Sequence, residues 1–203
     1  YAQFEEGFYK ARKAGFDNIS VDLMSALPGQ TETSWEATLN RVTALGPEHI
    51  SAYSLIIEEG TPFYERYTGA GASMLPDEDA ERRMYYRTRK LLRAAGYCRY
   101  EISNYARPGF ESRHNSGYWT GAEYLGMGLG ASSYMGNTRF RNTRDLKTYL
   151  DSSDNPSAMQ REFHIQTAQD NMEEFMFLGL RMMKGIHTGE FHSRFGKTID
   201  AVY

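Results

Sequence analysis

The hydrophobic residues of the first half of the chain alternate between helical and strand-like spacing. Apolar residues at helical spacing predict a first helix over residues 3–14 that ends at Gly15. Short apolar runs follow at 19–24 and 49–57, and each ends at a loop with proline and glycine that cannot continue a strand. The pattern therefore predicts helices that alternate with buried strands.

Two longer helices are expected. One lies between these two strands, and the other lies between the second strand and a third strand. The spacing of Thr33 and Glu36 predicts a capping box at the start of a helix that ends at a Gly-Pro pair. Asp77 is expected to cap the next helix, which carries a continuous apolar stripe. The mostly apolar run at 97–106 is then the third predicted strand.

This order of elements predicts an α/β fold. Helices that alternate with mostly apolar strands favour parallel strands covered by helices. A closed barrel of eight βα units needs about 250 residues, and only two or three such units are visible in residues 1–106. We therefore expect residues 1–106 to form βα units of a partial, TIM-like barrel.

The composition changes after Pro108. Residues 107–150 are rich in glycine, asparagine, serine and aromatic residues, and we expect an irregular extension with a glycine-rich strand at 124–131. Residues 151–156 resemble a linker, and the apolar spacing beyond them predicts two helices. Because these are too few for a core of their own, 151–203 is interpreted as the truncated start of a mostly helical domain.

Charge and composition exclude several classes of protein. The chain has 203 residues, with 23 Lys and Arg against 26 Asp and Glu, a balance that favours neither nucleic acid nor anionic lipid as a partner. No apolar run approaches the roughly 20 residues of a transmembrane helix. A single cysteine, Cys98, suits a reducing compartment and predicts a cytoplasmic protein. One cysteine cannot hold an iron–sulfur cluster.

Asp22 is the first candidate for a functional side chain. It lies within an apolar strand, where burial of an unpaired carboxylate costs several kcal/mol. At the carboxyl end of a barrel strand such a residue commonly faces a ligand, and ribose hydroxyls or a catalytic cation are plausible partners. The alternative is structural, with the carboxylate capping backbone amides of the Pro28-Gly29 loop.

The second candidate is the segment from Arg113 to Trp119. Neutral His114 can bind a metal ion through one ring nitrogen, with Asn115 or a backbone carbonyl orienting the ring. Tyr118 and Trp119 can stack on a flat hydrophobic ligand. The alternative interpretation is an ordinary surface histidine that forms hydrogen bonds.

The remaining histidines and the glycine series are weaker candidates for functional motifs. The remaining histidines, His49, His164, His187 and His192, show no convincing metal-ligand spacing and are interpreted as structural. The series of three glycines at 126–130 lacks the context of a dinucleotide motif. We expect it to let another backbone or a ligand approach closely.

Three longer stretches together resemble a known family. They are residues 19–31, with the run Leu-Pro-Gly-Gln-Thr, residues 47–62, and residues 100–119. In combination they are similar to the HemN/HemW branch of radical S-adenosylmethionine (SAM) proteins. The resemblance implies a partial (βα)6 barrel, a [4Fe-4S] cluster that binds SAM, and a helical C-terminal domain. It also implies that the cluster cysteines lie upstream of Tyr1.

Within this branch, His114, Asn115, Tyr118 and Trp119 resemble the HNxxYW signature of the members that act as haem chaperones. The resemblance implies that His114 is a ligand of the haem iron and that Asp22 contacts SAM. The function that it implies is a haem-binding chaperone that delivers haem to an acceptor protein. The alternative is an oxygen-independent coproporphyrinogen III oxidase, which decarboxylates propionate side chains.

Overall fold

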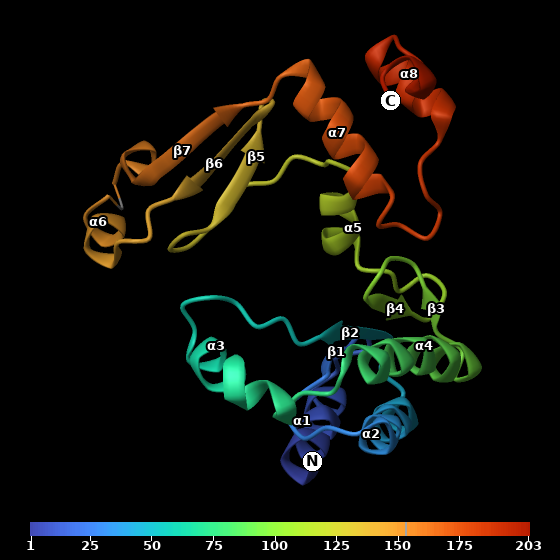
Figure 1. The fold of residues 1–203 in the computed structure, drawn as a ribbon. Helices are drawn as coiled ribbons and strands as arrows, with labels where there is room; N and C mark the ends of the chain where they lie inside the picture. The colour runs from blue at the N-terminus through green and yellow to red at the C-terminus, as the bar shows by residue number, and fades with distance from the viewer. Residues whose placement is uncertain (153) are drawn as a thin grey trace. The chain divides into compact units, whose positions relative to one another are not determined.

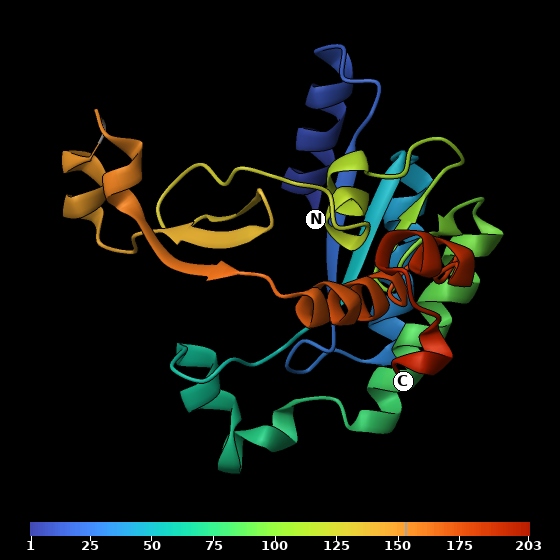
Figure 2. The same cartoon turned by 90° about the horizontal axis from the view of Figure 1, so that it is seen from above.

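The computed structural model describes residues 1–152 and 154–203, which form two units, Tyr1–Ser112 and Arg113–Tyr203. Each unit contains a β-sheet and helices, as Figure 1 and Figure 2 show. The fold is therefore mixed α/β, as the sequence predicts in outline.

The first unit follows the predicted alternation of helices and strands. Its elements are α1 (Ala2–Lys13), β1 (Ser20–Ser25), α2 (Glu32–Leu45), β2 (His49–Ser54), α3 (Pro62–Tyr67), the 3-10 helix η1 (Gly69–Met74), α4 (Glu78–Ala94), β3 (Cys98–Arg99) and β4 (Asn104–Ala106).

The sheet of this unit has the strand order β1-β2-β4-β3. Strands β1 and β2 are parallel, with Asp22 beside Ser51. The prediction of a single parallel strand over 97–106 is wrong, because β3 and β4 form an antiparallel pair and β4 runs antiparallel to β2. The carboxylate of Glu101 stabilises the turn between them by accepting hydrogen bonds from the amide of Ser103 (2.9 Å) and the side chain of Asn104 (2.5 Å).

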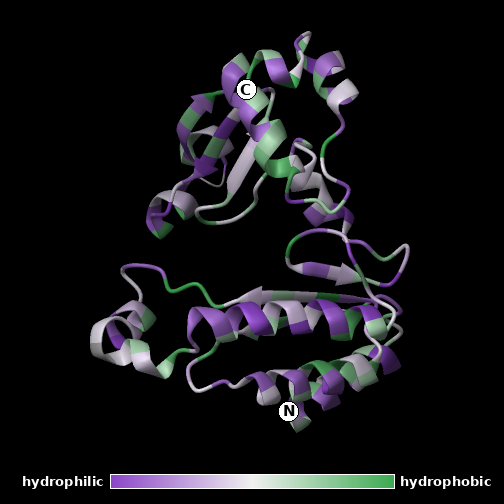
Figure 3. Ribbon diagram, turned by 45° about the vertical axis from the view of Figure 1, so that its right-hand side comes forward, coloured by the Kyte–Doolittle hydropathy of each residue, from purple (hydrophilic) through white to green (hydrophobic). Residues whose placement is uncertain are grey.

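Helices α1, α2 and α4 lie on one side of this sheet in Figure 1. Figure 3 shows hydrophobic and hydrophilic residues mixed along these helices, as expected when one face of each helix is buried. The buried residues at the centre of the core come from all three helices, from the sheet and from the segment between α4 and β3: Phe8, Val21, Trp35, Leu39, Val42, Ile50, Met84, Leu92, Tyr97 and Tyr105.

The helix caps confirm one prediction and correct another. Asp77 caps α4 by accepting a hydrogen bond from the amide of Ala80 at 2.7 Å. The capping box of α2 is formed by Thr31 and Ser34, two residues before the predicted pair. Glu36 instead pairs with an arginine of α4.

The second unit has more strand than the sequence predicts. Its elements are α5 (Arg113–Trp119), β5 (Ser132–Met135), β6 (Thr138–Asn142), α6 (Leu146–Asp151), the 3-10 helix η2 (Pro156–Met159), β7 (Gln160–Ile165), α7 (Ala168–Gly179), α8 (Thr188–Phe195) and the 3-10 helix η3 (Ile199–Ala201). Strands β5, β6 and β7 form an antiparallel sheet in that order. Because β6 pairs with β7, this sheet joins the predicted segments 107–150 and 151–203.

The glycine-rich strand predicted at 124–131 is wrong, since only Tyr124 pairs there, through an isolated bridge to Tyr134. The sequence does contain a signal for the hairpin that follows. Gly136 and Asn137 connect β5 to β6 with positive φ angles of 55° and 61°. A Gly-Asn pair between two strands is typical of such a two-residue turn.

The first unit depends on a buried hydrogen bond in which Trp35 Nε1 donates to Thr88 Oγ1 at 2.8 Å. We expect Thr88→Val to destabilise the unit by about 1–3 kcal/mol, because the indole N–H loses its acceptor while the side-chain shape is kept. The unfolding midpoint in urea measures this loss. The control Thr38→Val removes a hydroxyl of a half-buried residue whose hydrogen bond to the Ser34 carbonyl is exposed, and it should shift the midpoint much less.

Candidate functional site

The structure places Asp22 on an exposed position of β1, so the predicted burial of this carboxylate is wrong. Strand β1 is an edge strand, and its side chains alternate between the two faces of the sheet. Val21 and Ser25 are buried, whereas Asp22 faces the opposite side. The amide of Gly29 donates to the carbonyl of Met74 at 2.8 Å, so it is not available for the alternative capping role.

The face that carries Asp22 also presents a chain of polar side chains. His49 is buried, and its Nδ1 lies 2.8 Å from the hydroxyl of Ser20. Its Nε2 lies 2.9 Å from the hydroxyl of Tyr100. Strand register places Ser20 beside His49 and Asp22 beside Ser51. Sequence reasoning interpreted His49 as structural and overlooked this network.

A second polar group is formed by the turn between β3 and β4 and by the strands β4 and β2 of the same sheet. Glu101 is fully buried and accepts a hydrogen bond from Asn104, whose side-chain nitrogen also lies 3.4 Å from the hydroxyl of Tyr53. Polar residues at every second position of β1 and β2 are the signal in the sequence that could have indicated this face. The face offers the exposed carboxylate of Asp22 and the exposed hydroxyl-bearing side chains of Ser20 and Tyr53 to a polar ligand.

Burial lowers the pKa of His49, and the nearby charges of Asp22 and Glu101 oppose this shift. An unfolded chain binds a proton near the ordinary histidine pKa of about 6.5, while folded His49 resists protonation. Folding stability is therefore lost as the pH falls through that value toward the lowered pKa of the folded state.

We expect His49→Gln to reduce the loss of stability between about pH 7 and pH 5, because this variant has no buried imidazole at that position. The difference in unfolding free energy between the variant and the natural chain, measured at several pH values, should narrow as the pH falls. The control His192→Gln changes an exposed histidine. A constant difference for His49→Gln would contradict the expectation.

His114 and Tyr118 lie on the same side of α5, because residues four apart in a helix are neighbours. The sequence predicts an irregular segment here, and the structure corrects it to a short helix. The Tyr118 hydroxyl lies 3.2 Å from His114 Nε2, and the two rings meet edge to face at 4.9 Å. His114 is exposed, whereas Tyr118 is half-buried.

These two side chains line an open hollow of the second unit. Its other lining residues come from the segment that follows α5 and from the first residue of β5: Tyr124, Leu125, Gly126, Met127, Ala131 and Ser132. Leu125 is 60% exposed and Met127 is 89% exposed. Exposed apolar side chains beside a histidine suit a ligand that is largely hydrophobic and can bind a ring nitrogen.

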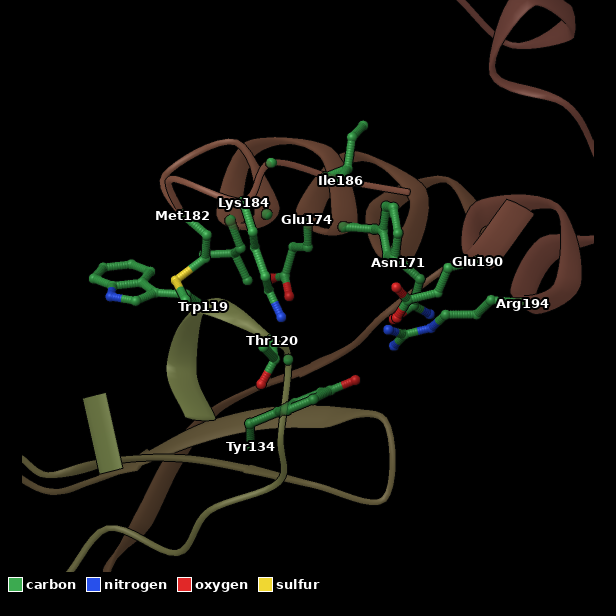
Figure 4. Close-up of a pocket in the computed structure, with 15 residues that line it drawn as sticks. Trp119, Thr120, Tyr134, Asn171, Glu174, Met182, Lys184, Ile186, Glu190 and Arg194 are labelled. Atoms are coloured by element: carbon green, nitrogen blue, oxygen red, sulfur yellow. The ribbon is translucent and has the colours of Figure 1, made fainter. Parts of the chain in front are cut away.

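Trp119 lines a different cavity, which Figure 4 shows. Its indole ring packs against the guanidinium of Arg181 at 4.1 Å, and the same cavity is lined by Met182. Figure 4 also shows the charged ends of Glu174 and Lys184 in this cavity. The structure therefore does not bring Trp119 together with His114 and Tyr118 in one hollow. Asn115 is half-buried on the same helix.

The glycine series shapes the loop beside His114. A Cβ atom on Gly126 would lie 2.1 Å from the carbonyl oxygen of Ser132, so only glycine allows this approach. Gly128 has a φ angle of 113° and Gly130 one of 68°. The predicted close approach of another backbone is confirmed at Gly126.

We expect Gly126→Ala to destabilise the second unit, because backbone atoms must move to accept the methyl group. The cost is of order 1–3 kcal/mol, as for other overpacked sites. Thermal unfolding measures it. The matched control is Gly117→Ala, whose added methyl group would lie 3.7 Å from its nearest neighbour, an ordinary contact. Equal melting temperatures for the two variants would refute this role of Gly126.

The described residues can be searched for metal-binding groups, disulfides and membrane-spanning helices. No group of three or more histidine, cysteine, aspartate or glutamate side chains lies close enough there to hold a metal ion. Cys98 is exposed and forms no disulfide. None of the described helices is both long and apolar enough to cross a membrane.

The fold of this chain is similar to part of a solved radical SAM enzyme. Coproporphyrinogen III oxidase (HemN) from Escherichia coli, a radical SAM enzyme, superposes with a TM-score of 0.78 and 21% identity, covering 96% of this chain and 47% of that one. The model of the HemN C-terminal domain family matches residues 166–203.

Sequence comparison narrows the relationship. The heme chaperone HemW of Bacillus subtilis is 40% identical over 97% of the chain, and that of Lactococcus lactis is 36% identical over 99%. The predicted relationship to the HemN/HemW branch of radical SAM proteins is therefore confirmed along nearly the whole chain. The chain spans about half the length of these relatives, 52% in both cases.

Proposed function

We propose that this chain is part of a haem-binding chaperone that delivers haem to an acceptor protein, with His114 as the ligand of the haem iron. The observation that carries the proposal is the exposed imidazole of His114 at a hollow that is also lined by Leu125 and Met127 and by two tyrosine rings. A neutral histidine is the commonest protein ligand of haem iron, and a porphyrin needs apolar contacts for its faces. Relatives named as heme chaperones support this choice.

Of the HNxxYW residues, His114 and Tyr118 line the hollow proposed for the flat macrocycle, and Asn115 and Trp119 do not. Tyr118, Tyr124 and Met127 provide aromatic and thioether surfaces around His114. Trp119 lines the other cavity, and its ring packs against Arg181, which supports α5. We assign the haem contacts to His114 and Tyr118, and the anchoring of their helix to Trp119.

The first unit is proposed to form part of a TIM-like barrel whose inner face carries Asp22. SAM would place ribose hydroxyls on the Asp22 carboxylate, which is exposed beside Ser51 and can accept their hydrogen bonds. A [4Fe-4S] cluster needs cysteine ligands, and this chain provides only Cys98. The lone cysteine also agrees with a cytoplasmic location.

The rival function is oxidative decarboxylation of coproporphyrinogen III. The fold of HemN favours it, but a structural likeness at 21% identity supports the fold alone. The higher identity to the heme chaperones favours haem delivery. Porphyrinogen turnover by the purified protein, with reductant and SAM under anaerobic conditions, would favour the enzyme. Stable haem binding without turnover supports the chaperone.

We expect His114→Ala to weaken haem binding at least about tenfold, since the iron loses its protein nitrogen ligand. A titration of the purified protein with ferric haem, followed by the Soret absorbance, measures the affinity and the change in ligation. The control His192→Ala removes another exposed histidine and should leave the titration unchanged. Unchanged haem uptake by His114→Ala would overturn the assignment of the ligand.

A further inference from the structure

One ring nitrogen of His114, which lines the hollow, already has a partner in this structure. Nε2 lies 3.2 Å from the hydroxyl of Tyr118. In either neutral tautomer Nε2 has a single site, a lone pair or a hydrogen, and the Tyr118 hydroxyl occupies it. An iron atom bonded to Nε2 would need the same site. Tyr118 and haem iron therefore compete for one atom.

The hydroxyl of Tyr118 is held in place by its surroundings. The ring of Tyr118 meets that of Tyr124 edge to face at 4.6 Å. Tyr124 is fixed in turn by two backbone hydrogen bonds with Tyr134, at 2.8 and 2.9 Å, and its hydroxyl accepts a hydrogen bond from Arg139 at 3.3 Å. These contacts join Tyr118 to the sheet of the second unit. The contact with His114 is therefore part of a connected arrangement.

We propose that Tyr118 is a latch on His114: its hydroxyl holds Nε2 in the haem-free protein, is displaced when haem binds, and recovers Nε2 when haem leaves. The proposal rests on the proposed function, because it concerns the same His114 and the same cargo. It adds a role in haem release, which a carrier needs as much as uptake. The hydrogen bond to Tyr118 replaces the lost iron bond, so Nε2 is satisfied in both states.

The latch lowers haem affinity by the contribution of one hydrogen bond to the binding equilibrium. Such a bond to a neutral partner changes an equilibrium constant by about two- to tenfold. Tyr118→Phe keeps the aromatic ring and its packing on Tyr124 but removes the competing hydroxyl. We therefore expect this variant to bind haem about two- to tenfold more tightly.

The experiment compares Tyr118→Phe with the natural protein in two measurements. The first is a titration with ferric haem followed by the Soret band, which reports affinity and iron ligation. The second is the rate of haem transfer to apomyoglobin, which reports release. We expect tighter binding, an unchanged Soret position and slower transfer for Tyr118→Phe.

The matched control is Tyr86→Phe, which removes an exposed tyrosine hydroxyl from α4 of the first unit. Tyr86 does not line the hollow, so this variant should leave both the Soret position and the haem affinity unchanged. Circular dichroism of all variants checks that the helices are kept.

Three outcomes would overturn the latch. Unchanged affinity of Tyr118→Phe means that the hydroxyl does not compete for Nε2. Weaker binding with an unchanged spectrum means that Tyr118 orients a ring whose Nδ1 binds iron, and a shifted spectrum means that Tyr118 itself is the ligand. His114→Ala separates these results from failure of the proposed function. If that variant binds haem normally, the ligand assignment fails whatever Tyr118 does.

Discussion

The arrangement of the second unit depends on the side chain of Arg139. Its guanidinium pairs with both oxygens of Glu174 on α7, at 2.8 and 2.6 Å, and it also packs over the ring of Tyr134 at 4.5 Å. The same group donates to the hydroxyl of Tyr124. The hydrogen bond with Glu174 raises the pKa of Arg139, so the charge is kept. One cation thereby joins β6, β5, α7 and the loop that leads toward the hollow. A two-pronged arginine–carboxylate pair suits this task because its geometry is fixed in a plane.

This connection explains how a seven-residue helix can present a defined histidine. Helix α5 has no buried residue of its own, and isolated helices of this length are unstable in water. Tyr118 packs on Tyr124 from one side, and Trp119 packs on Arg181 from another. The two aromatic residues of the motif therefore serve α5 differently. Tyr118 lines the hollow with His114, whereas Trp119 lines the cavity that residues of α7 also line.

A glycine shapes the hollow of the second unit, and a pair of polar residues shapes the sheet of the first unit. Gly126 lets its loop lie against the carbonyl of Ser132, which shapes the hollow beside His114. In the first unit, Glu101 and Asn104 form the turn that reverses the chain into β4. That reversal gives the sheet its antiparallel pair. It also places Asn104 beside Ser51, on the face that carries Asp22.

The sequence by itself determined the elements whose signals are local. Apolar periodicity indicated α1, α2, α4 and the strands β1 and β2, and Asp77 marked the start of α4. The combination of motifs indicated the family, which the comparisons confirm. Only the tertiary structure decided the direction of β4, the exposure of Asp22 and the separation of Trp119 from His114. Periodicity reports whether a residue lies on an apolar or a polar face of its own element. It carries no information on which neighbouring element covers that face, and that depends on contacts between residues far apart in the chain.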